Sequence, residues 1–261
     1  MNQMRTDFKV DRSSMSDAEW DLRVDLAAAY RLVDHFGWTE LIYGHLTARV
    51  PGPDLHFLIN PFGLNYDEVT ASNLVKIDID GKIVDETPYG VNHAGFVIHS
   101  AVHMANSDVN KVVMHTHTRA GMAVAATKEG LTPISMYATT FHKRLSYHDY
   151  EGASLYLDER DRLLASLGQN KSMILKNHGL MTLGRTVAEA FLRLYRLERA
   201  CQIQVDTGGA GTPSLLSDNL ATKSGDEVEG FPEGDNPDDY GRIEFNALPR
   251  KLDKTDSSFR D

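Results

Sequence analysis

The first strong pattern of apolar residues predicts an amphipathic helix near the start of the chain. Ser16 and Glu19 have the spacing of a capping box, in which a serine caps a helix that carries glutamate three residues later. The apolar residues that follow recur at intervals of three and four: Leu22, Leu26, Ala29, Val33 and Phe36. This is the period of one helix face, and Gly37 is a suitable stop.

Shorter apolar runs, rich in β-branched residues and bounded by turn residues, predict strands. We expect strand structure over residues 41–50, 55–59, 76–84, 111–115 and 171–177. The third of these is expected to be a hairpin with its turn at Asp80-Gly81. Helices are expected after Asn92, after His117 and after Thr186, where the capping-box spacing recurs. This mixture predicts an α/β domain.

The composition of the chain changes after Val205. Residues 206–239 are rich in Gly, Ser, Asp and Pro and have little apolar periodicity, which predicts a linker or a tail. Residues 243–252 regain enough apolar side chains to dock. We therefore expect an N-terminal extension over 1–15, one domain over 16–205, and a linker with a docking tail over 206–261.

Charge and cysteine content narrow the classes of function. The chain has 261 residues and a formal net charge of −10, which argues against nucleic acid or an anionic membrane as a partner. Cys201 is the only cysteine, so no internal disulfide can form. The first twenty residues lack the apolar stretch of a signal peptide, and no window is apolar enough to cross a bilayer. We expect a cytoplasmic protein.

Histidines at two strand ends are the main candidate chemistry. His115 and His117 stand two apart, so both would project from the same face of the strand over 111–115. His178 follows the apolar run over 171–177 in the same way. Three imidazoles at adjacent strand ends would form an open metal site, although each could also be a polar residue at a strand exit.

Several motifs together resemble the class II aldolase/adducin family, and within it the adducin-head branch. Besides the histidine pair, the matching segments are residues 41–50, 56–63, 68–72, 90–96, 147–150 and 177–180. They occur in order at compatible spacings and cover residues 17–206.

The resemblance implies a three-layer α/β/α fold around a mostly antiparallel sheet. It also implies one divalent metal, with zinc favoured over iron or manganese, on His115, His117 and His178. Such a metal would stabilise the enolate that forms when a bond beside a carbonyl breaks. Family aldolases place their sites between subunits, which implies a small-molecule substrate and a homo-oligomer, with a tetramer favoured.

One departure from the family concerns acid–base chemistry. Family aldolases carry Ser-Ser-Glu where this chain has His93-Ala94-Gly95, so the catalytic carboxylate is replaced by Gly95. His93 is the nearest substitute, and Tyr137 matches a tyrosine that some relatives offer across the subunit interface as a proton donor. A packing role for His93 and a non-catalytic interface role for Tyr137 stay open.

A second departure concerns the phosphate pocket. The resemblance places an asparagine at His45 and a threonine at Phe62 in aldolases that bind sugar phosphates. Their replacement predicts an unphosphorylated keto-acid or aromatic ligand. The other expected substrate-binding residues are Gly63, Asn92 and His99. His103, one helical turn after His99, could share its face or simply lie at the surface.

Three functions of different classes follow from the resemblance. The first is a metal-dependent lyase, an aldolase or a decarboxylase. The second is a non-haem iron oxygenase or oxidative decarboxylase, which three imidazoles would also suit. The third is a non-catalytic, adducin-like oligomeric module of the cytoskeletal type. True adducins continue into a basic tail that engages spectrin and actin, and this chain shows no such tail up to Asp261.

Overall fold

The structure, a computed structural model, describes residues 8–152, 159–230 and 236–261, without the side chains of residues 93, 94 and 97. Its strands are β1 (His45–Arg49), β2 (Phe57–Ile59), β3 (Val75–Ile77), β4 (Val112–Thr116), β5 (Ser146–His148), β6 (Ser172–Leu175) and β7 (Gly179–Gly184). Its α-helices are α1 (Asp17–His35), α2 (His93–Ala105), α3 (Arg119–Ala125), α4 (Met136–Thr139), α5 (Glu159–Leu167), α6 (Val187–Ala210), α7 (Asp218–Glu229), α8 (Arg242–Ala247) and α9 (Pro249–Leu252). Short 3-10 helices cover Arg12–Ser14, Tyr66–Glu68, Pro237–Asp239 and Ser258–Arg260.

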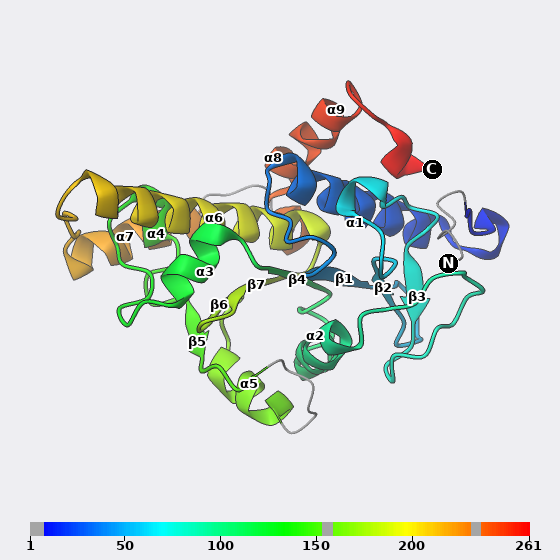
Figure 1. The fold of residues 1–261 in the computed structure, drawn as a ribbon, viewed down its shortest axis with the longest axis horizontal. Helices are drawn as coiled ribbons and strands as arrows, with labels where there is room; N and C mark the ends of the chain where they lie inside the picture. Colours follow the sequence, from blue (N-terminus) through cyan, green and yellow to red (C-terminus); the bar gives the residue numbers. More distant parts are fainter. Residues whose placement is uncertain (1–7, 153–158, 231–235) are drawn as a thin grey trace.

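The described strands form one sheet in the order β3-β2-β1-β4-β7-β6-β5. Every neighbouring pair is antiparallel except β5 and β6, which are parallel. Helices α1 and α6 and the C-terminal helices cover one face of this sheet, and α2 and α5 cover the other (Figure 1). The expected three-layer α/β/α fold with a mostly antiparallel sheet is confirmed.

Strand β4 lies in the middle of the sheet and is buried along its whole length. Side chains alternate between the faces of a strand. Met114 belongs to the core beneath α1 and α6, and Val113 belongs to the core beneath α2 and α5. His115 therefore emerges on the α2 side, at the end of the strand.

Helix α1 begins as the sequence predicts. The Ser16 hydroxyl accepts a hydrogen bond from the backbone N–H of Glu19, which satisfies one free donor at the helix start. The Glu19 carboxylate does more than a capping-box glutamate, because it pairs with the buried Arg23 at 3.1 Å and with Lys76 at 2.9 Å. The pair with Lys76 connects α1 to β3.

Two of the predicted strands differ most from the structure. Residues 41–44 do not belong to β1, because Leu41 has a positive φ of 52° and Gly44 a positive φ of 83°. These left-handed residues bend the chain just before His45, so an apolar run that reads as strand is partly a turn. In the predicted hairpin over 76–84, the turn forms at Gly81, but beyond β3 only Ile83 pairs, in a single bridge to Ile77.

The region after Val205 contains more helix than its composition predicts. Helix α6 continues to Ala210, and α7 forms within the stretch expected to lack periodic structure. The sequence pattern does not reveal α7 because this helix buries only the small residues Ala221 and Gly225. A Cβ atom on Gly225 would fall 2.4 Å from the carbonyl oxygen of Thr139, so the contact with α4 needs a residue without a side chain. Close packing of small residues leaves no apolar stripe in the sequence.

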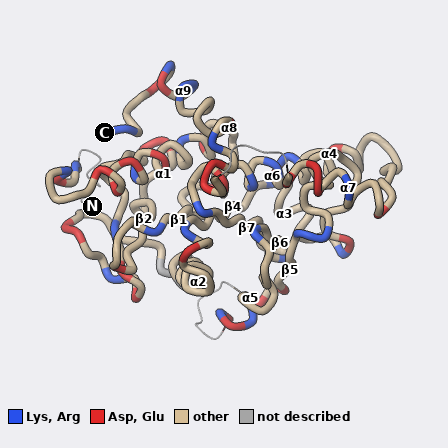
Figure 2. The backbone as a smooth tube through the Cα atoms, turned by 180° about the vertical axis from the view of Figure 1, so that it is seen from behind, with Lys and Arg blue, Asp and Glu red and all other residues tan. Residues whose placement is uncertain are grey.

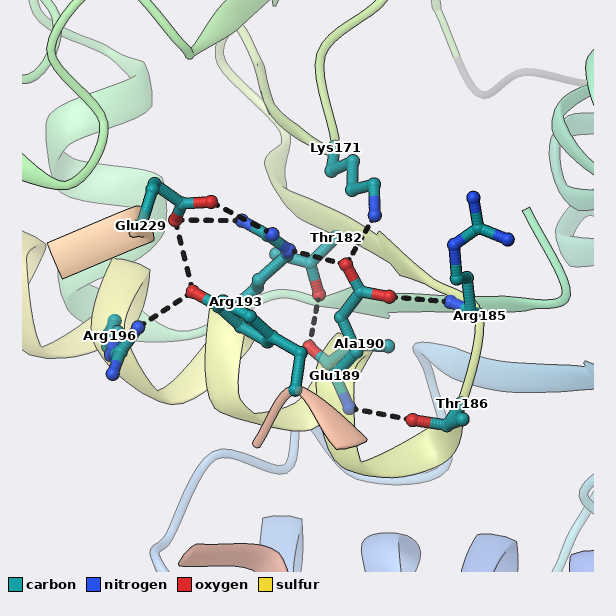
Figure 3. Close-up of polar contacts among 10 residues, drawn as sticks. Lys171, Thr182, Arg185, Thr186, Glu189, Ala190, Arg193, Arg196 and Glu229 are labelled. Atoms are coloured by element: carbon teal, nitrogen blue, oxygen red, sulfur yellow. Dashed lines mark hydrogen bonds and ion pairs between the residues drawn. The ribbon is translucent and has the colours of Figure 1, made fainter. Parts of the chain in front are cut away.

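A buried polar cluster joins α7 to the sheet (Figure 3). Glu189 accepts hydrogen bonds from Arg193 Nε at 3.2 Å and from the backbone N–H of Arg185 at 2.8 Å. Its carboxylate also contacts Lys171 at 2.5 Å. Arg193 then pairs with Glu229 at the end of α7, at 3.1 Å.

The C-terminal helices pack on the α1 and α6 side. Phe245 of α8 is 1% exposed and Leu252 of α9 is 7% exposed, so the apolar side chains of this segment are buried. Acidic and basic residues are mixed along the outer helices of the described chain (Figure 2). Within the described ranges, none of the helices combines the length and the apolar character that a bilayer crossing requires.

Candidate functional site

Three histidines meet at the ends of the central strands. His115 is the fourth residue of β4, where it pairs with His45 of β1 on one side and with Met181 of β7 on the other. His117 lies two residues further along the same strand direction. His178 occupies the turn between β6 and β7, which Asn177 makes possible by adopting a positive φ of 56°.

These histidines form a compact group of potential ligands. One ring nitrogen from each of His115, His117 and His178 lies within 4.8 Å of the others. The ring centroids are 4.6 to 4.9 Å apart. His115 Nε2 and His117 Nε2 approach to 2.8 Å. Within the described ranges this is the group of metal-ligating side chains that could hold an ion.

The hydrogen-bonding of His115 fits a metal ligand. Its Nδ1 lies 2.9 Å from the carbonyl oxygen of Leu180, which can only accept, so Nδ1 carries the proton. In a neutral ring Nε2 then has a free lone pair, and this lone pair faces His117. A backbone carbonyl that fixes the tautomer of a ligating histidine is a common support in metal sites. The donor set therefore suits a divalent cation such as zinc, iron or manganese.

The electrostatic environment keeps these rings uncharged. Burial lowers the pKa of His115 well below its usual range, and the nearby imidazoles of His178 and His117 act in the same direction. Burial and His117 lower the pKa of His178 to about 4, and burial also lowers the pKa of His117. Neutral imidazole is the form that binds a metal, so the ligands need not lose a proton near neutral pH.

A cavity of about 450 Å³ opens in front of the three histidines. Besides them, it is lined by Tyr43, Gly44, His45, Phe62, Asn92, Ile98, Met122, Tyr150, Gly152 and Asn177. These lining residues include no carboxylate and no lysine or arginine. A volume of this size holds a small organic molecule, and the aromatic and aliphatic walls favour an apolar part in that molecule.

The imidazole of His45 takes up space that a side chain at position 95 would need. A Cβ atom on Gly95 would fall 2.1 Å from His45 Cδ2 and 2.4 Å from His45 Nε2. Both distances are far below van der Waals contact. The glycine and the histidine therefore depend on each other, and a glutamate at position 95 would require His45 to move.

His45 is also one end of a chain of hydrogen bonds beneath α2. Its Nδ1 lies 2.9 Å from His99 Nε2, and His99 Nδ1 lies 2.7 Å from Thr47 Oγ1. The hydroxyl of Thr47 lies 2.8 Å from His103 Nε2, and His103 Nδ1 lies 2.6 Å from the carbonyl oxygen of Asn110. All of these side chains are buried.

The structure brings together most of the residues expected near the substrate. His45, Phe62 and Asn92 line the cavity, and His99 supports His45 from behind. Gly63 is exposed and follows Phe62 with a positive φ of 106°, which fits a turn residue. The surface location considered for His103 is wrong, because this side chain is 1% exposed and completes the hydrogen-bond chain.

Tyr137, one of the two expected catalytic residues, is not among the residues that line this cavity. His93 begins α2, and its side chain lies outside the described part of the structure. Tyr137 of α4 lines a different cavity of about 530 Å³, together with Phe36, Phe191 and Tyr195. Within one chain it does not face the three histidines.

The sequence did not indicate that Thr47 and Tyr150 belong to the site. Thr47 stands two residues after His45 on the same strand, so the period of two could have placed it on the same face. The turn that presents His178 fits the sequence Asn177-His178-Gly179, because asparagine tolerates the positive φ that Asn177 adopts. Tyr150 reaches the cavity from the loop after β5, and no local pattern indicates this.

Comparisons with known proteins agree with this arrangement. The family described as "Class II Aldolase and Adducin N-terminal domain" matches residues 24–205. An aldolase II superfamily protein from Pseudomonas syringae has a similar crystal structure, with a TM-score of 0.89 and 49% identity over 97% of this chain and 100% of that chain. The L-fuculose 1-phosphate aldolase from Glaciozyma antarctica PI12 has a TM-score of 0.79 and 27% identity over 98% of both chains. Rat alpha-adducin is 47% identical over 89% of this chain, which matches 33% of that protein.

Proposed function

The chain belongs to the class II aldolase and adducin family, and on this premise we propose that it is a metal-dependent lyase acting on an unphosphorylated carbonyl compound. The observation that carries the proposal is the group of three neutral histidines whose nitrogens face a cavity of molecular size. An aldol cleavage or a decarboxylation needs a Lewis acid beside a space for the substrate, and the three histidines next to the cavity could hold such a metal there.

We propose that His115, His117 and His178 hold one divalent metal, with zinc favoured. A bound metal would supply positive charge that polarises a carbonyl oxygen of the substrate. Three protein ligands leave further positions open for that purpose. The carbonyl of Leu180 keeps His115 in the tautomer that can ligate.

The cavity walls support an unphosphorylated substrate. Phe62, Ile98 and Met122 contribute apolar surface, and the lining residues provide no lysine or arginine to pair with a phosphate. A keto acid or an aromatic carbonyl compound would fit these walls. The G. antarctica relative is an aldolase for a phosphorylated sugar, and the substrate proposed for this chain differs from its substrate in this respect.

The acid–base residues of the reaction are also proposed. His93 remains the candidate on the same chain, since it opens the helix that borders the cavity. Tyr137 is proposed to act from a neighbouring copy, as it does not line the cavity of its own chain.

A homo-oligomer, with a tetramer favoured, is part of the same proposal. Tyr43, Phe62 and Tyr150 line the cavity and remain 49%, 37% and 58% exposed in the single chain, and nearby Leu41 is 72% exposed. Apolar surface gathered at the mouth of a site is typical of a region that another chain covers. Sedimentation velocity measures the state directly.

The decisive experiment is elemental analysis of untagged protein purified without a chelator. We expect about one divalent metal per chain, and its loss in His178→Ala, because two imidazoles alone bind weakly. His35→Ala is the matched control, since His35 is an exposed histidine at the end of α1. A His115→Ala/His178→Ala protein that retains the metal would rule the assignment out.

The identity of the metal separates the lyase from its alternatives. Zinc or manganese, followed by cleavage of unphosphorylated hydroxy-keto acids observed by NMR, supports the lyase. Iron that is lost in air supports a non-haem iron oxygenase. The identity to rat alpha-adducin favours a second candidate, a non-catalytic oligomeric module. A chain that takes up no metal in any preparation would support that candidate.

A further inference from the structure

The polarity of the buried hydrogen-bond chain can be deduced from one end. The carbonyl oxygen of Asn110 only accepts, so the proton between it and His103 lies on His103 Nδ1. A neutral His103 must then accept at Nε2, and the Thr47 hydroxyl must donate to it. Because a hydroxyl has a single proton, Thr47 accepts from the ring on its other side.

The proton positions on His99 and His45 follow in the same way. His99 donates from Nδ1 to Thr47, so its Nε2 carries a lone pair. That lone pair must accept from His45 Nδ1, which therefore bears the proton. In neutral His45 the remaining nitrogen, Nε2, is left as an acceptor.

These proton positions hold only when His99 and His103 are neutral, and the surroundings of both rings favour the neutral form. Both rings are 1% exposed, and their hydrogen-bond partners in the described structure are imidazoles, a hydroxyl and a carbonyl. A buried imidazolium without a carboxylate is costly. Burial accordingly lowers the pKa of His103 to about 4.

The free nitrogen of His45 belongs to a ring that borders the cavity. His45 is one of the lining residues, and Nε2 makes no hydrogen bond to a described residue. Nε2 is not fully enclosed by protein either. The side-chain atoms of the described chain that are both fully buried and without a hydrogen bond are Trp38 Nε1, Thr116 Oγ1 and His148 Nε2. A ligand in the cavity thus meets a lone pair of His45 beside the three-histidine group.

We propose that His45 Nε2 is a fixed hydrogen-bond acceptor that selects a substrate with a hydroxyl donor and rejects a phosphate ester at this position. Thr47, His99 and His103 are positioning residues that hold His45 in the required tautomer. A lone pair repels phosphate oxygens but accepts from a hydroxyl, and among the described residues no lysine or arginine lines the cavity to offset that repulsion. The selection of substrate depends on the proposed function, whereas the tautomer does not.

The tautomer is tested by long-range ¹H–¹⁵N NMR of uniformly labelled, metal-free protein at slightly alkaline pH. We expect His45, His99 and His103 all to carry their proton on Nδ1. Thr47→Val should abolish this uniform pattern, and Thr47→Ser should retain it. Thr182→Val is the matched control. Thr182 is also a buried threonine, but it donates its hydrogen bond to the carbonyl oxygen of Ala190 and takes no part in the hydrogen-bond chain of His45, His99 and His103. A proton on His45 Nε2 in the wild-type protein overturns the inference, even if a variant fails to fold.

The preference for a hydroxyl donor over a phosphate ester is tested with a matched pair of probes on zinc-loaded protein. Calorimetry should show that dihydroxyacetone binds roughly tenfold more tightly than dihydroxyacetone phosphate, as loss of one well-placed hydrogen bond implies. His45→Gln, whose amide can donate, should narrow this ratio. Equal or tighter binding of the phosphate, or no binding of either probe to metal-loaded protein, overturns the selection. Absence of any metal uptake counts against the proposed function, while the NMR measurement still decides the tautomer.

Discussion

The ring of His45 and the missing side chain of Gly95 fill the same space. A Cβ atom at position 95 would lie 2.1 Å from His45 Cδ2, so the two residues are coupled although 50 positions separate them in the sequence. The absence of a carboxylate at position 95 therefore goes together with the presence of the His45 ring in the space that such a side chain would need. This coupling can be measured.

Gly95→Ala should destabilise the fold by about 1–3 kcal/mol, because an added methyl group overpacks the contact with His45. In a His45→Ala background the same substitution should cost much less, which urea unfolding of the four proteins in a double-mutant cycle would show. Gly208→Ala is the control, since a Cβ at Gly208 in α6 meets nothing within 4 Å. Additive effects of the two substitutions would contradict the coupling.

Stability of the metal-free protein should fall as the pH is lowered from about 6.5 to about 4. The pKa of buried His103 is lowered to about 4 from an ordinary value of 6.5, so between these values the unfolded chain binds a proton that the native protein does not. This stability is fully present above pH 6.5 and is lost as the pH falls through 4, and for His103 alone it amounts to about 3 kcal/mol. Urea unfolding across this range measures it, and a flat profile would contradict the assignment.

The sequence predicted the parts of the site that follow a regular period. His115 and His117 could be placed on one face because residues two apart on a strand share a face, and His178 because its strand also ends at the cavity. The sequence could not predict that the ring of His45 lies against Gly95, because that contact depends on how α2 crosses β1. The role of Asn110 was equally hidden, since it acts through a backbone carbonyl that any residue possesses.

The wrong predictions about the fold have a similar origin. Leu41 was expected in a strand because it is apolar, yet it is exposed and has a positive φ. Helix α7 was missed because it packs through Ala221 and Gly225, whose burial leaves no large apolar side chain as a signal. In the case of α7, a tertiary contact stabilises a helix that the local sequence pattern does not predict.

Tyr30→Phe should destabilise the protein by about 2–3 kcal/mol. The buried hydroxyl of Tyr30 accepts from the backbone N–H groups of Leu46 at 2.8 Å and Asn60 at 3.2 Å, and both donors would lose their partner. Tyr195→Phe is the control, because its hydroxyl has only a partly buried contact with Arg199. Equal midpoints for the two variants in urea unfolding would refute this role.

Glu189→Gln should cost about 3 kcal/mol, because it removes the buried counter-charge of Lys171 and leaves Arg193 paired with Glu229 alone. Glu227→Gln breaks only the exposed pair with Lys223 on α7 and should change stability by less than about 0.5 kcal/mol. Thermal unfolding at matched concentration compares the two variants. Similar losses would mean that the cluster in Figure 3 contributes no more than a surface pair.

The order of the strands also determines when the histidines can meet during synthesis. β4 is enclosed by β1 on one side and by β7 on the other, and β7 ends at Gly184. Until β7 has left the ribosome, His115 has a neighbouring strand on one side only, and His178 has no turn to hold it. Contacts so distant in sequence form late in folding. A nascent chain that stops short of β7 therefore exposes three separate, solvated histidines, and they become one cluster only when the sheet closes.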